Sequence, residues 1–131
     1  MRTLITGGTR GIGRATALDC AARGWPVALG YRGNAAAAEA TLEAVRAAGG
    51  TGAAFAADVA DAGEVARLFD EATAAMGGLD AVVVNAGIVF PVMPLAEMDP
   101  DRIARMVQVN LTGALYQARE AARRLPDGGT I

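Results

Sequence analysis

The chain has 131 residues and a mean hydropathy of +0.29, which fit a single globular domain rather than a disordered protein. Its 12 basic and 14 acidic residues give a net charge of -2 with no basic tract, which argues against nucleic-acid or membrane partners. The chain lacks histidine, lysine and serine. This excludes Ser-His nucleophilic catalysis, Schiff-base chemistry and histidine-based metal sites, so no metal site is expected. One cysteine, Cys20, and no signal peptide favour a cytoplasmic location.

Apolar runs alternate with helical patterns along the chain. In chain order the pattern predicts a strand at residues 1–6, a helix at 11–23, a strand at 26–31, a helix at 35–48, a strand at 51–57, a helix from the capping pattern Asp61-x-x-Glu64 to the glycines at 77–78, a strand at 79–84 and a long helix at 101–125. Residues 130–131 begin a further strand. This order, with short connections, predicts a doubly wound α/β fold with a parallel sheet.

The helix ends and helix faces are also predicted. Asn34 and Asp99, the latter followed by Pro100, are expected to cap the helices that they precede. The apolar spacing predicts three buried faces: Ile12, Ala15, Leu18 and Ala22 on the first helix; Val65, Leu68, Phe69 and Ala72 on the third; Ile103, Val107, Leu111, Ala114 and Ala118 on the last.

The turn between the first strand and the first helix is rich in glycine. Residues 6–13 read Thr-Gly-Gly-Thr-Arg-Gly-Ile-Gly. A pyrophosphate can approach backbone N–H groups at a helix N-terminus only where no Cβ blocks it, and a further glycine lets the helix pack closely on the strand. The candidate dinucleotide-binding residues of this turn are Gly7, Thr9, Arg10, Gly11, Ile12 and Gly13. The alternative is a tight turn without a ligand.

The end of the second predicted strand indicates which dinucleotide would bind. A site selective for NAD places an acidic residue here, on the ribose 2′-hydroxyl. This chain has Tyr31 and Arg32 instead, and an arginine suits a 2′-phosphate by its charge and fork geometry. Arg10 can add a second positive charge, so NADP is expected rather than NAD. The alternative is a pair of solvated surface arginines.

Polar residues follow the next two strands. Because ligands in such sheets bind outside the carboxyl ends of strands, Asp58-Val59 and Asn85-Ala86-Gly87 are candidate cofactor-binding residues. Asp58 is suited to the adenine amino group or, alternatively, to forming a turn. Asn85 is suited to tying neighbouring strands together, and Gly87 to leaving room for the cofactor. Asn110 is placed on the inward stripe of the last helix, where a buried amide needs hydrogen-bond partners.

Together these motifs, with Val109-Asn110-Leu111 followed by Gly113, resemble the short-chain dehydrogenase/reductase family. The resemblance covers essentially the whole chain. It implies a Rossmann fold, a nicotinamide cofactor, and hydride transfer between an alcohol and a carbonyl compound. Tyr31-Arg32 resembles the NADPH-preferring branch, which includes 3-oxoacyl-acyl-carrier-protein reductases. The resemblance makes Asn110 a catalytic residue that supports a proton-relay water, and it implies a homo-oligomer through the long helix.

The chain departs from this family in one respect. The family's catalytic Ser and Tyr-x-x-x-Lys follow the strand that begins here at Thr130, and this chain contains no Ser or Lys. We therefore expect residues 1–131 to be a partial dinucleotide-binding domain, inactive alone, from a parent enzyme acting on a small carbonyl or alcohol substrate. The alternatives are a non-catalytic NADP-binding module, a remnant, or a subunit completed by another chain.

Overall fold

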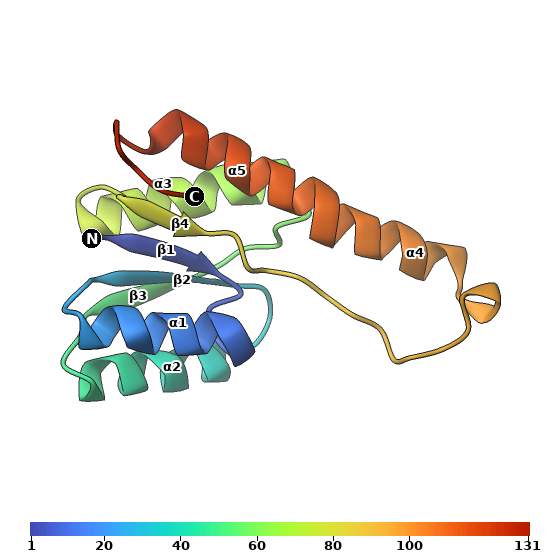
Figure 1. The fold of residues 1–131 in the computed structure, drawn as a ribbon, viewed down its shortest axis with the longest axis horizontal. Helices are drawn as coiled ribbons and strands as arrows, with labels where there is room; N and C mark the ends of the chain where they lie inside the picture. The colour runs from blue at the N-terminus through green and yellow to red at the C-terminus, as the bar shows by residue number, and fades with distance from the viewer.

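The computed structural model describes all 131 residues and contains a parallel four-stranded sheet in the order β3-β2-β1-β4 (Figure 1). The elements in chain order are β1 Thr3–Thr6, α1 Gly11–Ala22, β2 Val27–Tyr31, α2 Ala35–Ala47, β3 Gly52–Ala56, α3 Ala62–Met76, β4 Ala81–Val83, a 3₁₀ turn Leu95–Glu97, α4 Pro100–Val107, a π-helical turn Gln108–Thr112 and α5 Gly113–Arg124. Every strand and helix predicted between residues 1 and 125 is present, with ends that differ by at most two residues.

The sheet is covered on both faces, which confirms the predicted doubly wound fold. Helices α1 and α2 lie on one face, and α3 and α5 lie on the other (Figure 1). Successive residues of β1 point to opposite sides, so Leu4 packs in the cluster under α3 while Ile5 packs in the cluster under α1. At residues 130–131, where the sequence predicts the start of a further strand, the structure has a single parallel bridge, from Thr130 to Ala81 in β4.

The predicted helix caps are present. The Asn34 side chain accepts a hydrogen bond from the Ala37 N–H, and the Asp99 side chain accepts one from the Asp101 N–H. Asp61 likewise accepts from the Glu64 N–H at 2.9 Å. In a complete capping box the Glu64 carboxylate would accept a hydrogen bond from the Asp61 N–H. Here it accepts one from the Asp58 N–H instead, at 2.7 Å. Glu64 therefore anchors the loop after β3 to the first turn of α3.

The predicted buried face is confirmed for α3 and wrong for α1. Val65, Leu68, Phe69 and Ala72 are all fully buried. On α1 the buried residues are Gly13, Ala17, Cys20 and Ala21 instead of the predicted Ile12, Ala15, Leu18 and Ala22, and Ile12 is 77% exposed. Helix α1 carries small apolar residues all around its circumference, so its pattern defines no face. The close approach of Gly13 to the β1–α1 turn decides the rotation of the helix.

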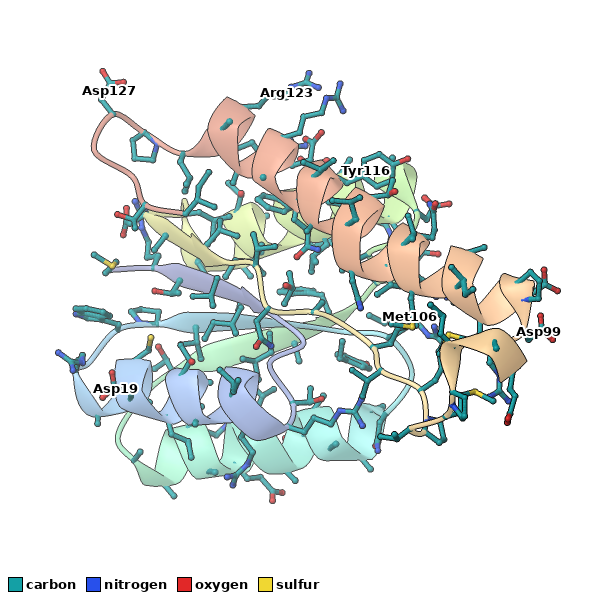
Figure 2. All side chains as sticks on the ribbon, turned by 45° about the vertical axis from the view of Figure 1, so that its right-hand side comes forward. Asp19, Asp99, Met106, Tyr116, Arg123 and Asp127 are labelled. Atoms are coloured by element: carbon teal, nitrogen blue, oxygen red, sulfur yellow. The ribbon has the colours of Figure 1, made fainter.

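The long helix also turns a different face inward. It runs across the molecule from near Asp99 to beyond Arg123 (Figure 2), and its inward residues are Val109, Gly113, Gln117, Glu120 and Ala121. The predicted inward residues Ile103, Val107 and Leu111 are 40%, 49% and 57% exposed, and Ala114 and Ala118 are only partly buried. Helix α4 has no buried residue, because it extends beyond the sheet (Figure 1). None of the helices combines the length and the apolar character needed to cross a bilayer.

Candidate functional site

The β1–α1 turn is shaped by glycines in conformations that other residues rarely adopt. Gly7 and Gly11 have φ angles of +63° and +52°. A Cβ on Gly7 would lie 3.0 Å from Ala86 Cα, and a Cβ on Gly13 would lie 2.3 Å from the Gly7 carbonyl oxygen. The turn is therefore packed against the end of β4 and the start of α1, with no room for a side chain at Gly7 or Gly13.

The N-terminus of α1 is open at this turn. Arg10, the cap residue, makes no side-chain hydrogen bond to the helix, and the first turn holds no acidic residue. The unpaired N–H groups and the helix dipole thus remain available to an anion. This donor set, together with the glycine backbone, fits the pyrophosphate of a dinucleotide.

A hydrogen-bond network joins the end of β1 to the end of β4. The Asn85 side-chain amide donates to the carbonyl oxygens of Thr6 at 2.9 Å and Gly7 at 3.2 Å. The Thr6 hydroxyl accepts from the backbone N–H groups of Asn85 and Ala86, each at 3.1 Å. Asn85 thus ties neighbouring strands together, as its position after β4 predicted. Thr6 is fully buried, and its part in this network was not predicted from the sequence.

The carboxyl ends of the strands surround a cleft of about 810 Å³. Twelve of the thirteen residues predicted to bind the cofactor line it: Gly7, Thr9, Arg10, Gly11, Ile12, Tyr31, Arg32, Asp58, Val59, Asn85, Ala86 and Gly87. The thirteenth, Gly13, is buried beneath the turn. The topology of the sheet therefore brings four separate sequence motifs to one cavity.

The Asp58 carboxylate lies at the edge of this cleft, between two arginines. Its Oδ2 atom is 2.6 Å from Arg105 Nη2 and 3.9 Å from Arg32 Nη1, and its Oδ1 atom accepts a hydrogen bond from the Ala60 N–H at 3.0 Å. Burial by itself raises the pKa of this carboxyl. The Ala60 N–H, the Arg105 hydrogen bond and charge, and the Arg32 charge outweigh burial and hold the pKa below its ordinary value.

The long helix positions the loop that carries Asp58. Besides the Arg105 contact, the Gln108 side chain donates to the Ala60 carbonyl oxygen at 2.8 Å. A Cβ on Gly113 would lie 2.8 Å from the Val59 carbonyl oxygen, so this glycine lets the helix pack directly on the loop. Sequence reasoning missed Arg105 and Gln108 as site residues. Their only signal is the three-residue spacing, which places them on one helix face.

Asn110 lies in the π-helical turn, and its predicted burial is wrong because the residue is exposed. Its amide nevertheless has backbone partners: Oδ1 accepts from the Ile88 N–H and Nδ2 donates to the Ile88 carbonyl oxygen, both at 2.8 Å. A Cβ on Gly87 would lie 3.3 Å from Asn110 Oδ1. Asn110 therefore holds the segment after β4 at the side of the cleft where Ile88 lies.

The two tyrosines lie apart from one another. Tyr31 ends β2 and lines the cleft. Tyr116 lies on α5, across the sheet from α1 (Figure 2), and packs against the core cluster beside α3. Glu120, the residue four positions after Tyr116, is nearly buried and pairs with Arg119, Arg123 and Arg124.

The parallel sheet wound on both faces and its glycine turn define a Rossmann-type α/β protein. The family model described as "short chain dehydrogenase" matches residues 2–131. The chain therefore belongs to the short-chain dehydrogenase family, as the sequence motifs indicated.

Individual relatives agree with this assignment. Short chain dehydrogenase/reductase AacuN of Aspergillus aculeatus is 39% identical over 128 residues, which are 98% of this chain and 48% of the relative. A short chain dehydrogenase from Burkholderia cenocepacia, solved in complex with NADP, is 40% identical with a TM-score of 0.90 over 98% of this chain and 52% of that one. NAD⁺-bound xylitol dehydrogenase is 30% identical with a TM-score of 0.88 over 93% and 46%. The chain thus spans about half the length of these relatives.

Proposed function

We propose that residues 1–131 form the cofactor-binding half of an NADP(H)-dependent oxidoreductase that interconverts a carbonyl compound and an alcohol. The observation that carries the proposal is the single cleft in which the glycine turn and Arg32 meet. Bound NADPH supplies the hydride for such a reaction. The coverage of about half of each relative supports a longer parent protein. 3-Oxoacyl compounds are the first carbonyl substrates to test, because of the resemblance of Tyr31-Arg32 to reductases of that kind.

Each side chain of the site has a proposed task. The N–H groups of the turn hold the pyrophosphate, Arg32 with Arg10 binds the 2′-phosphate, and Asp58 contacts the adenine amino group. The small residue Gly87 leaves room beside the cleft. Asn110 is assigned to a catalytic proton relay, and its hydrogen bonds to Ile88 hold it in place for that task.

The choice of NADP over NAD depends on the arginines, because the similar solved structures include one bound to NADP and one bound to NAD⁺. We expect isothermal titration calorimetry to find tighter binding of NADPH than of NADH. Arg32→Asp removes the phosphate partner and adds a partner for the 2′-hydroxyl, so it should reverse a preference of roughly ten-fold. Equal affinities of the unmodified protein for the two nucleotides would exclude the 2′-phosphate assignment.

A second candidate is a module that binds the nucleotide without chemistry, as a remnant or as a subunit completed by another chain. The absence of Ser and Lys from the 131 residues favours it for the chain as given, which we expect to be inactive alone. The intact mass of the protein in its native cell separates the two. A mass near twice 13.3 kDa supports the oxidoreductase, and a mass of 13.3 kDa supports the module.

We also propose a homo-oligomer in the cytoplasm. Ile103, Val107, Leu111 and Leu115 repeat every four residues on the long helix and are 40–61% exposed, which forms an apolar stripe that a second copy can cover. Cys20 is a buried free thiol, as suits a reducing compartment. Light scattering of the complete protein should find a dimer or larger species, and Leu111→Arg should shift it toward the monomer. If light scattering found the unmodified complete protein to be a monomer, the oligomer proposal would be wrong.

A further inference from the structure

Two arginines compete for one oxygen of Asp58. Arg105 on α4 and Arg32 after β2 both face Oδ2, at 2.6 Å and 3.9 Å. Asp58 cannot turn freely, because its Oδ1 atom is bound by the Ala60 N–H and its own N–H donates to Glu64. These charged groups share one hollow of about 510 Å³ beside the cofactor cleft, which Arg67 also lines. The carboxylate therefore has one strong partner and one weaker partner.

The two arginines are held differently. The Arg105 side chain is 33% exposed, and its helix is anchored to the same loop by Gln108. The Arg32 side chain is 62% exposed, and its guanidinium makes no hydrogen bond beyond the long ion pair. Arg32 is thus the cation that can turn toward a ligand in the cleft, and Arg105 is the one held at the carboxylate.

The charge of Asp58 opposes a phosphate at this end of the cleft. A carboxylate repels a nearby phosphate, and without Arg105 it would also hold Arg32, the other arginine that it pairs with. Arg105 prevents both effects, because its charge neutralises Asp58 at hydrogen-bond distance. The preference for a 2′-phosphate then depends on a residue that need not touch the cofactor.

We propose that Arg105 is a positioning residue for cofactor specificity: by pairing with Asp58 it leaves Arg32 free to bind the 2′-phosphate of the cofactor. The inference rests on the proposed NADP site. It differs from that proposal because it concerns α4, an element outside the nucleotide-binding motifs of the sequence.

The test compares two probes of the adenine end by calorimetry, in the protein as its complete gene encodes it. The probes are adenosine 2′,5′-bisphosphate and 5′-AMP, which differ only in the 2′-phosphate. Arg105→Gln should lower the ratio of their affinities roughly five-fold, the effect of one moderately exposed charge pair. Arg102→Gln is the matched control, because it removes the same charge from the same helix at a residue that contacts Phe90 and Met93 rather than Asp58.

Two further variants separate a charge effect from a folding defect. Arg105→Lys retains the positive charge and should recover most of the preference. Asp58→Asn combined with Arg105→Gln removes the carboxylate that would hold Arg32, so the affinity ratio should return toward that of the unmodified protein. Any weaker adenine binding affects both probes and cancels in the ratio. A purely structural role of Arg105 predicts that the double variant is no better than the single one.

The possible results separate the two proposals. If the unmodified protein binds neither probe, or binds both equally, the proposed NADP site is wrong and the inference falls with it. If the unmodified protein prefers the bisphosphate but Arg105→Gln changes the ratio less than two-fold, the NADP site stands and the role of Arg105 is wrong. The same conclusion follows if Arg102→Gln lowers the ratio as much as Arg105→Gln does.

Discussion

The glycine turn after β1 and the loop after β3 line the same cleft, but the structure holds them in place by different means. The turn is held by close packing of its glycine backbone and by uncharged hydrogen bonds, among them those from the Asn85 side-chain amide to the Thr6 and Gly7 carbonyl oxygens. The loop is held by side chains from a helix more than forty residues away, chiefly the charge pair of Arg105 and Asp58. We therefore expect an added side chain to disrupt the turn, and a change of charge or pH to destabilise the loop.

The largest effect is expected at Gly13. Gly13→Val should abolish NADPH binding, a loss of at least about 100-fold, because even its Cβ would lie 2.3 Å from the Gly7 carbonyl oxygen. Ala15→Val on the same helix is the matched control, because Ala15 is exposed and should tolerate the same side chain. Calorimetry measures the binding, and circular dichroism with the milder Gly13→Ala checks the fold. Retained binding in a folded Gly13 variant would mean that the turn is not the site.

The second effect concerns the hydroxyl of Thr6. Thr6→Val keeps the shape of a fully buried side chain but leaves two backbone N–H groups without their acceptor, so it should lower the free energy of unfolding by about 2–3 kcal/mol. Thr3→Val, in the same strand, removes a buried hydroxyl that has no hydrogen-bond partner and should have almost no effect. Urea denaturation measures both variants, and equal losses would contradict the proposed importance of the network.

The smallest effect is expected at the loop and should depend on pH. Asp58→Asn retains an acceptor for the Ala60 N–H but removes the charge that pairs with Arg105, so we expect a loss of about 1 kcal/mol at pH 7. The folded-state pKa of Asp58 lies below its unfolded value. The stabilisation is therefore present above about pH 4 and is lost as the pH falls through the folded-state pKa.

Thermal unfolding of the unmodified protein and of Asp58→Asn, each at pH 7 and near pH 3, tests this dependence. The difference in stability between the two proteins should be largest at pH 7 and should become smaller in acid. A difference that stays constant from pH 7 to pH 3 would show that the charge pair does not hold the loop.

Much of the fold follows from local patterns. The strands and helices, the caps at Asn34 and Asp99, and the buried face of α3 could all be predicted, because each depends on residues close together in the chain. The residues that line the cleft could also be predicted from the sequence, since the carboxyl ends of parallel strands meet at one edge of the sheet. The apolar pattern predicted the wrong buried face for α1 and for the long helix. Both carry apolar residues on several faces, so the pattern does not define how the helix is rotated about its axis.

The sequence by itself determined the parallel α/β architecture, the family and the residues that line the cleft, because glycine, proline, capping residues and apolar periodicity act over a few positions. Only the tertiary structure decided which face of α1 and of the long helix is buried, and that Arg105 shares Asp58 with Arg32. Such contacts depend on how far a helix extends beyond the sheet and how it is rotated. The close approaches of Gly13 and Gly113, between segments distant in the chain, set that geometry.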